Sequence, residues 1–436
     1  MYYKEELIIK LKNKTAKIGV LGLGYVGLPL AVEKAKAGYD VIGFDVQEDK
    51  VLKINKGLNY IGDVIPEDLS ELVSNNKLSA TNDFSKISEV DALAICVPTP
   101  LDIYKQPNMD YVKASAESVA NFMSEGTLVV LESTTYPGTT EEIIKTVIED
   151  KGFEIGVNAF IAYSPERVDP GNKEFKTKNT PKVVGGVTEN CTQVAATMYR
   201  NVLEGDVHEV SSPSVAEMEK LLENTFRNIN IALANEMAIL CDKMGIDVWE
   251  VIDAAATKPY GFMPFYPGPG LGGHCIPIDP WYLTYKAREY NYHTRLIETA
   301  GEINDDMPQF IVSKISEILN TKRKSLNGSK ILVLGVAYKK DIDDYRESPV
   351  LPILNKLSQS EANWKVVDPY ISEFKLNDEI YATAKLDGNL LTSADLVLIT
   401  TNHSNFNYED IFNKSNLILD TRNSYSNINS SKYYRI

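Results

Sequence analysis

The chain has 436 residues, 44% of them hydrophobic and 24% charged, with 60 Asp and Glu against 45 Lys and Arg. This length predicts two or three domains, each able to bury a core. The formal net charge of −15 excludes a broad nucleic-acid-binding face, which needs clustered cations. No apolar run approaches the ~18 residues of a membrane span, and the N-terminal stretch is charged, so we expect a cytoplasmic protein that binds neither nucleic acid nor membrane.

The first 210 residues alternate short apolar runs with helical stretches. The runs at 17–21, 40–45, 91–97 and 127–131 are predicted strands. This alternation predicts a parallel sheet with helices on both faces.

A glycine motif, G-L-G-Y-V-G, follows the first predicted strand and opens a helix. Gly22 permits a tight turn, Gly24 lets the backbone approach a pyrophosphate, and Gly27 allows close packing of helix and strand. Asp45 ends the next strand, where it can accept both ribose hydroxyls and repel a 2′-phosphate. The motif therefore predicts NAD rather than NADP as cofactor.

The middle of the chain is predicted to be helical. A long helix is expected over residues 214–244, with Ser214 and Glu217 as a capping box and Gly245 as its stop. Two shorter helical regions follow, at residues 247–258 and 295–320.

Four polar residues of the long helix, Glu217, Lys220, Asn224 and Arg227, are spaced by three or four residues and share one face. One interpretation is a solvated stripe of charges. The other places Lys220 and Asn224 in a cleft, as hydrogen-bond donors to a developing oxyanion.

After a polar linker at 321–329, the strand-and-helix alternation returns. The runs at 330–339, 365–370 and 395–401 resemble those of the first domain, but of the three glycines only Gly335 remains. We expect this copy to bind something other than a dinucleotide. The predicted fold is α/β, with two Rossmann-like doubly wound parallel-sheet domains joined by a helical connector. The predicted domains are residues 1–210, 211–320 and 321–436.

The segment 261–280 is dense in glycine and carries Cys275, with Asp279 four residues later. Glycine is favoured where backbone must approach a ligand closely. Cys275 is thus either a catalytic nucleophile, whose pKa the adjacent His274 could lower, or an ordinary loop thiol. We interpret the other three cysteines, Cys96, Cys191 and Cys241, as structural. None of the four cysteines lies in a C-x-x-C motif, so neither disulfides nor a metal site is expected.

Several motifs together resemble the UDP-glucose/GDP-mannose dehydrogenase family. They are G-L-G-Y-V-G, S-T-T-Y-P-G-T, S-P-E-R at 164–167, the helix with Lys220 and Asn224, G-G-H-C-I-P-I-D, and Y-K-K-D with R-E-S-P. They occur in the family's order from about Lys17 to Arg422. P-E-R-V-D-P-G-N and P-G-P-G-L-G-G-H-C-I-P-I-D-P resemble most the members that act on UDP-N-acetylhexosamines.

The resemblance implies an NAD-dependent four-electron oxidation of a sugar C6 alcohol to a carboxylate. Cys275 would hold the aldehyde as a thiohemiacetal and then the acid as a thioester. Lys220 and Asn224 would stabilise oxyanions, and Glu166 would assist hydrolysis. Asp279 and Thr134 would hold a water molecule.

The resemblance also implies the remaining binding residues. Beyond the motif residues named above, the expected cofactor contacts are Tyr25, Val26, Lys50, Thr99 and Thr134. The expected contacts of a UDP-sugar substrate are Glu166, Arg167, Lys220, Asn224, Tyr266, Gly272, Lys339, Arg346 and Arg422.

Two departures from the UDP-glucose enzymes bear on the substrate. Pro170 stands where those enzymes carry a second glutamate, and the stretch Lys258–Pro259 stands where they carry an arginine that reaches a partner subunit. We therefore expect UDP-N-acetylglucosamine in preference to UDP-glucose, with UDP-glucose, UDP-N-acetylmannosamine and UDP-N-acetylgalactosamine as the alternatives. The acid would supply surface polysaccharide synthesis, and the enzyme would be a homodimer or larger assembly.

Two other classes remain open. A two-electron β-hydroxyacid dehydrogenase would form one NADH per substrate rather than two, and would need neither Cys275 nor a second α/β domain. A non-catalytic NAD-binding regulator would be indifferent to replacement of Cys275.

Overall fold

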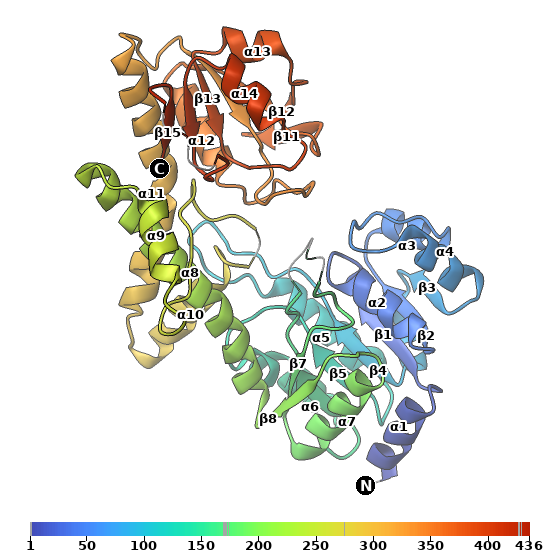
Figure 1. The fold of residues 1–436 in the computed structure, drawn as a ribbon. Coiled ribbons are helices and arrows are strands. Elements are labelled where there is room, and N and C mark those ends of the chain that lie inside the picture. The colour runs from blue at the N-terminus through green and yellow to red at the C-terminus, as the bar shows by residue number, and fades with distance from the viewer. Residues whose placement is uncertain (1, 169–171, 173, 274, 426–427, 429) are drawn as a thin grey trace. The chain divides into compact units, whose positions relative to one another are not determined.

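A computed structural model describes residues 2–168, 172, 174–273, 275–425, 428 and 430–436. The chain divides into two compact units (Figure 1). The N-terminal unit comprises residues 1–223 and 281–292, and the C-terminal unit comprises 224–280 and 293–436. The predicted middle domain contributes to both units, and its boundaries stay a prediction.

The described part of the N-terminal unit is built around an eight-stranded sheet in the order β3-β2-β1-β4-β5-β6-β7-β8. Its first six positions follow the strand order 3-2-1-4-5-6 of dinucleotide-binding folds. The strands are β1 (Lys17–Leu21), β2 (Asp40–Phe44), β3 (Leu78–Thr81), β4 (Ala92–Ile95), β5 (Leu128–Leu131), β6 (Phe160–Tyr163), β7 (Lys182–Gly186) and β8 (Val207–Val210).

The register brings the carboxyl ends of the central strands to one edge. Leu21 at the end of β1 lies opposite Phe44 of β2 and Ile95 of β4. The expectation of parallel pairing holds for these strands, but β6 and β7 pair antiparallel. Antiparallel neighbours do not need the helical crossover that a parallel pair requires.

Helices cover both faces of this sheet. Leu11, Leu28 and Val194 from three helices share one buried cluster with Ile18 of β1. The alternate strand residues, such as Leu93, are buried as well. The helical segments are α1 (Tyr2–Lys12), α2 (Gly27–Lys36), α3 (Glu48–Asn55), α4 (Pro66–Ser74), the 3₁₀ segment η1 (Phe84–Glu89), α5 (Asp110–Phe122), the π-helical segment η2 (Thr140–Lys145), α6 (Thr146–Glu149) and α7 (Glu189–Arg200).

The described part of the C-terminal unit contains a five-stranded parallel sheet in the order β10-β9-β13-β14-β15, and a separate hairpin, β11-β12. One face packs on α11 and α12, and the other on α13 and α14. The elements are α11 (Arg295–Thr321), β9 (Lys330–Leu334), α12 (Val350–Gln359), β10 (Asn363–Val367), β11 (Glu373–Leu376), β12 (Glu379–Ala382), α13 (Gly388–Ser393), β13 (Leu396–Ile399), α14 (Tyr408–Lys414), β14 (Ile418–Asp420) and β15 (Tyr433–Arg435).

The long helix is α8 (Pro213–Met244), and the boundary between the units falls within it. Its predicted capping box is wrong. The Val215 amide donates to the Ser212 hydroxyl at 3.3 Å, so Ser212 caps the helix and Pro213 occupies its first position. Ser214 instead donates to Glu141, because a proline at the first position moves the start by two residues.

The C-terminus of α8 agrees with the expectation from Gly245. Gly245 has φ +68°, and its amide donates to Asp242 while the Ile246 amide donates to Cys241. This is the Schellman arrangement that a left-handed glycine permits. Three shorter helical segments belong to the middle of the chain: α9 (Val248–Ala256), α10 (Asp279–Ala287) and the 3₁₀ segment η3 (Arg288–Tyr290). Asp247 caps α9 at the start of the predicted helical region 247–258, whereas α10 was not expected.

No helix in the described part of the chain is both long enough and apolar enough to cross a membrane.

Candidate active site

The glycine motif forms a tight turn between β1 and α2. Gly22 has φ +91°, and its amide donates to the Phe44 carbonyl at 2.8 Å. A Cβ at Gly22 would lie 2.5 Å from the Cys96 carbonyl oxygen, and one at Gly27 would lie 1.8 Å from the Gly22 oxygen. A Cβ at Gly24 would meet nothing within 4 Å. The turn therefore packs tightly at two glycines and leaves open space at the third, beside the N-terminus of α2, where a pyrophosphate binds.

Asp45 lies directly after β2 at the same edge. Its two carboxylate oxygens accept the amides of Leu23 and Gln47, both at 2.9 Å, and Lys50 approaches one of them at 3.4 Å. A carboxylate has about four acceptor positions, so these contacts fix Asp45 and still leave capacity for ribose hydroxyls. The residues present fit an NAD molecule.

Other expected cofactor residues lie at the same strand ends. The Thr99 hydroxyl, after β4, donates to the Thr134 carbonyl, after β5, at 2.8 Å. Tyr25 is half exposed beside the open glycine, next to Val26, which is partly buried. The sequence did not reveal Tyr60, whose hydroxyl donates to the Leu23 carbonyl at 2.6 Å and supports the turn from 37 positions away.

Glu217 of α8 holds the turn that follows β5. Its carboxylate accepts the Gly138 amide at 2.6 Å and both the amide and the hydroxyl of Thr140, at 2.9 and 2.7 Å. Glu217 is fully buried, so it is no part of a solvated stripe, whereas Arg227 on the same helix is exposed. This contact fastens the S-T-T-Y-P-G-T segment, which carries Thr134, to α8.

Lys220 and Glu166 lie together in the N-terminal unit. The Lys220 ammonium donates to the main-chain carbonyl of Glu166 at 2.5 Å, and Lys220 is buried. One oxygen of the Glu166 carboxylate accepts the amides of Arg167 and Val168, both at 2.8 Å, and the other lies 3.5 Å from the Lys182 ammonium. Burial alone would raise the pKa of Glu166, but Lys182, the two amides and Lys220 together lower it. Glu166 is therefore ionised near neutral pH, as a general base must be.

The cysteine loop, residues 261–278, belongs to the C-terminal unit. Cys275 is half-buried, and its carbonyl accepts the amides of Ile278 and Asp279 at 3.1 and 2.8 Å. The Asn224 amide donates to the Asp279 carboxylate at 2.6 Å. The structure thus brings Cys275, Asp279 and Asn224 into one hydrogen-bonded segment.

Three asparagines that the sequence analysis did not single out hold this loop. Asn228 donates to the Ile276 carbonyl at 3.1 Å, and Asn235 accepts the Gly268 amide at 3.0 Å. Asn304 of α11 joins them, accepting from Asn235 at 2.9 Å. The spacing of 224, 228 and 235 along one face of α8 was the signal that could have found Asn228 and Asn235.

The strand ends of the C-terminal sheet lie against the cysteine loop. A Cβ at Gly268 would lie 2.7 Å from Nη1 of Arg422, and one at Gly272 would lie 2.6 Å from Cβ of Tyr338. Arg422 follows β14, and Lys339 follows β9, next to Tyr338. Burial lowers the pKa of Arg422 to about 10, so its guanidinium stays charged. Small residues of the loop therefore give these strand ends room.

Two expected substrate residues, Tyr266 and Arg346, are held by neighbouring side chains. Tyr266 stacks on Trp249, with centroids 5.4 Å apart, and its hydroxyl donates to Asp253 at 2.9 Å. Arg346 makes a bidentate contact with Asp344 at 2.9 and 2.7 Å. Tyr266 lies in the cysteine loop, and its two contacts hold it against α9.

The second sheet repeats the first turn without its ligand-accepting acid. Gly335 has φ +93°, and its amide donates to the Val367 carbonyl at 2.8 Å, as Gly22 does to Phe44. Asp368 takes the place of Asp45, but its carboxylate accepts four amides and lies 3.1 Å from the His403 ring. Asp368 thus serves the fold of this loop. The four amides are those of Val336, Ala337, Tyr370 and Ile371.

The other cysteines remain unsuited to catalysis. Cys96, Cys191 and Cys241 are buried, and burial raises the pKa of the Cys96 thiol well above its ordinary value. No disulfide joins the four cysteines, all of which the structure describes. His274 and Pro170, which the sequence analysis considered, lie outside the described residues.

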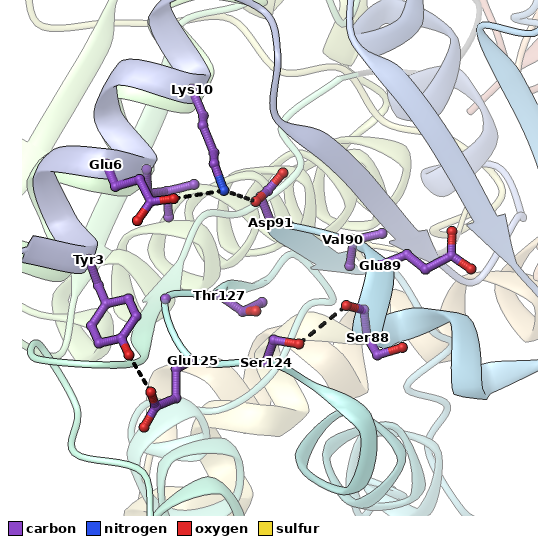
Figure 2. Close-up of a pocket in the computed structure, with 12 residues that line it drawn as sticks. Tyr3, Glu6, Lys10, Ser88, Glu89, Val90, Asp91, Ser124, Glu125 and Thr127 are labelled. Atoms are coloured by element: carbon purple, nitrogen blue, oxygen red, sulfur yellow. Dashed lines mark hydrogen bonds and ion pairs between the residues drawn. The ribbon is translucent and has the colours of Figure 1, made fainter.

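A pocket lies at the opposite edge of the N-terminal sheet, where β4 and β5 begin (Figure 2). Lys10 bridges Glu6 and Asp91 there, at 3.1 and 3.0 Å. Ligands of open α/β sheets bind at the carboxyl ends of the strands, so this hollow is not the active site.

Three family models match the chain in order. The NAD-binding domain of the UDP-glucose/GDP-mannose dehydrogenases matches residues 16–203, the central domain 214–306, and the UDP-binding domain 332–427. The chain belongs to the UDP-glucose/GDP-mannose dehydrogenase family. It is an NAD-dependent nucleotide-sugar dehydrogenase.

Relatives of this dehydrogenase carry two substrate names. The chain is 38% identical over 360 residues to UDP-N-acetyl-D-glucosamine 6-dehydrogenase of Pseudomonas aeruginosa, covering 82% of this chain and 84% of the relative. It is also 38% identical over 425 residues to UDP-N-acetyl-D-mannosamine dehydrogenase of Methanocaldococcus jannaschii, covering 94% and 93%. The structure of UDP-D-ManNAc dehydrogenase from Pyrococcus horikoshii aligns with a TM-score of 0.88 at 35% identity, covering 96% and 99%.

Proposed function

We propose that this dehydrogenase oxidises the C6 alcohol of a UDP-N-acetylhexosamine to the carboxylate, through a covalent intermediate on Cys275. The observation that carries the proposal is the cysteine loop. A half-buried thiol there is tied through Asp279 to Asn224 of α8, and the same loop packs on the nucleotide-binding edge of the C-terminal sheet. Named relatives of both sugar types support the N-acetylhexosamine class.

When bound, NAD accepts one hydride from C6 in each of two oxidations. Between them, the Cys275 sulfur adds to the aldehyde carbon and the carbonyl oxygen takes a proton, which gives a thiohemiacetal. After the second oxidation the same carbon is a thioester. Water then adds, the C–S bond breaks, and the carboxylate leaves while the thiol is restored. Per sugar, one alcohol, one water and two NAD+ give one carboxylate, two NADH and three protons.

The chain's own residues divide this work. Lys220 and Asn224, one turn apart on α8, donate to the oxygen that becomes negative at C6. Glu166, kept ionised, takes a proton from the attacking water. Asp279 and Thr134 orient that water. Lys339 and Arg422 meet the diphosphate of the sugar nucleotide with positive charge at the strand ends.

The decisive experiment replaces Cys275 by alanine. We expect loss of acid formation by at least 1000-fold in kcat, with the dissociation constant for NAD unchanged, because NAD binds in the N-terminal unit. NADH counted per sugar should be two in the native enzyme. Full turnover by Cys275→Ala, or one NADH per sugar, would contradict covalent catalysis and favour a two-electron dehydrogenase. Cys241→Ala is the matched control.

The sugar itself is tested with a panel. We expect UDP-N-acetylglucosamine to have a higher kcat/KM than UDP-glucose, and the manno and galacto epimers are assayed beside them. A higher kcat/KM for UDP-N-acetylmannosamine would change the proposed sugar to that epimer, and the proposed substrate class, UDP-N-acetylhexosamines, would stand. A preference for UDP-glucose would overturn the class.

We further propose that two copies associate through α8. Seven large apolar side chains along this helix are between 44% and 63% exposed. They recur every three, four or seven residues, so they form one stripe on a helix face. The stripe consists of Val215, Met218, Leu222, Phe226, Leu233, Leu240 and Met244. A twofold axis would cover the stripe of one copy with the same stripe of the other.

A further inference from the structure

Behind Glu166 lies a buried pair of opposite charges that the reaction described above does not use. Lys182 begins β7, and Glu132 directly follows β5. The Lys182 ammonium lies 2.6 Å from one oxygen of Glu132 and 3.5 Å from an oxygen of Glu166. The side chains of Lys182 and Glu132 are 5% and 0% exposed, against 16% for Glu166. Lys182 thus joins an interior carboxylate to the one that faces the site.

Each carboxylate oxygen of Glu132 has a partner in this arrangement. Its second oxygen accepts the hydroxyl of Tyr199, which is itself buried. The fully buried Lys34 ammonium lies over the Tyr199 ring, 4.9 Å from its centroid. Because the Glu132 side chain is also 0% exposed, it does not reach a substrate. It serves to keep the Lys182 ammonium in place, because a buried cation needs a partner.

The contact between Lys182 and Glu166 differs from that with Glu132. At 3.5 Å it is longer than the 2.7–2.9 Å of a strong charged hydrogen bond. The other oxygen of Glu166 is fixed by two main-chain amides. The oxygen that faces Lys182 is therefore attracted and oriented, yet retains acceptor capacity for a water molecule.

We propose that Lys182 is a positioning residue that holds the Glu166 carboxylate ionised and aimed, and so sets the acid limit of the reaction. This inference rests on the proposed function, in which Glu166 takes a proton from the water that hydrolyses the thioester. Glu132 anchors Lys182, and Tyr199 anchors Glu132. The chain of contacts runs from the interior of the sheet outward to the site.

The charged groups around Glu166 determine the direction of the effect. Lys182, Lys220 and Arg167 lie nearest and favour its ionised form. Glu132 and Lys34 lie behind Lys182 with opposite charges. Removal of the Lys182 charge leaves burial as the dominant influence, and burial raises the pKa of a carboxyl group. The acid limb of the kcat profile should then move to higher pH.

The test compares Lys182→Met with Lys182→Arg, which keeps the charge. For Lys182→Met we expect the acid limb of kcat to rise by about one pH unit or more, so that the loss of kcat approaches roughly tenfold at pH values well below the limb and disappears at pH 9. KM for the sugar nucleotide should change less than kcat. Lys182→Arg should keep the native limb. The matched control is Lys314→Met, which removes another ion-paired lysine, bound to Asp242 in the C-terminal unit.

A charge-balanced variant guards against misfolding. Lys182→Met leaves Glu132 without its cation, which can prevent folding. Lys182→Met combined with Glu132→Gln removes one charge of each sign and still deprives Glu166 of its ammonium. We expect the same upward shift of the acid limb. An unshifted limb in this variant, or in a folded Lys182→Met, overturns the inference.

Glu166→Gln separates this inference from the proposed function. We expect Glu166→Gln to lower kcat by 100-fold or more, and the addition of Lys182→Met to lower it little further, because both changes act through one group. If Glu166→Gln leaves kcat intact, the role of Glu166 fails and the inference with it. If Glu166→Gln is slow but Lys182→Met lowers kcat equally at every pH, the role of Glu166 stands and Lys182 is merely structural.

Discussion

Glu217 shows how a buried side chain can serve the site without touching a substrate. It accepts three hydrogen bonds from the turn after β5, and burial raises its pKa to about 7 despite them. The folded protein therefore binds this proton more tightly than the unfolded chain does. That contribution to stability is complete below about pH 4.5, the ordinary pKa, and is lost as pH rises through about 7.

The melting temperature should reflect this linkage. Between pH 5 and 8 the native protein should lose up to about 3 kcal/mol of stability at Glu217, whereas Glu217→Gln, which cannot ionise, should lack that part of the decline. Glu217→Gln should also be less stable at pH 5, because one oxygen cannot replace two. Thermal unfolding across this pH range measures both effects. Glu236→Gln, an exposed position on the same helix, should keep the native slope; equal slopes in all three proteins would refute the linkage.

The residues that sequence reasoning found are those whose chemistry is local. Gly22, Gly27 and Asp45 occupy one motif of fixed spacing, and the structure explains each by a close backbone approach or a strand end. Lys182 and Glu132 are 50 positions apart and meet only when β5 and β7 are folded into one sheet. No periodicity links them, so their pairing required the structure.

At the scale of elements, α8 carries the face that holds the cysteine loop. Asn224, Asn228 and Asn235 each contact a different part of the segment from Gly268 to Asp279. The helix was predicted to within one residue, but its capping was not. Composition alone did not reveal that Ser212, rather than Ser214, starts it, because both can cap a helix and the choice depends on Pro213.

Asn235→Ala tests whether this helix face fixes the loop. The change removes the acceptor of the Gly268 amide and the donor to Asn304, at a cost of about 1–2 kcal/mol. We expect Cys275 to react several-fold faster with iodoacetamide, and NAD to bind as before. Asn230→Ala, where the side-chain amide donates to a carbonyl of its own helix, is the control. Unchanged labelling in Asn235→Ala would mean that the loop is held by other contacts.

At the scale of the whole molecule, the two α/β domains could be predicted because similar apolar strands recur in both halves of the chain, each time with a glycine turn after the first strand. The antiparallel pairing of β7 escaped prediction, since an apolar run does not state its direction. So did α10, whose start lies beside the glycine-rich loop. The boundary between the two units does not coincide with helix ends, because α8 and α10 each contribute residues to both units.

The proposed dimer can be tested by the mass of the protein in solution. Light scattering should give a mass twice that of one chain, and Leu233→Glu with Leu240→Glu should reduce it to that of one chain, because two buried carboxylates on each stripe would lack partners. Ile380→Glu, at an exposed apolar residue of β12, should leave the mass unchanged. A native protein that scatters as a single chain would exclude the dimer.

The saturated Asp368 carboxylate has a consequence for an enzyme that must hold two different nucleotides at once. In the first sheet the corresponding acid, Asp45, keeps acceptor capacity that we propose an adenosine ribose uses, while in the second the acceptor positions are filled by the loop's own amides and an imidazole. Accumulating NADH would thus find one docking position per chain instead of two. Rising coenzyme levels should compete with NAD alone and leave occupancy by the sugar nucleotide intact.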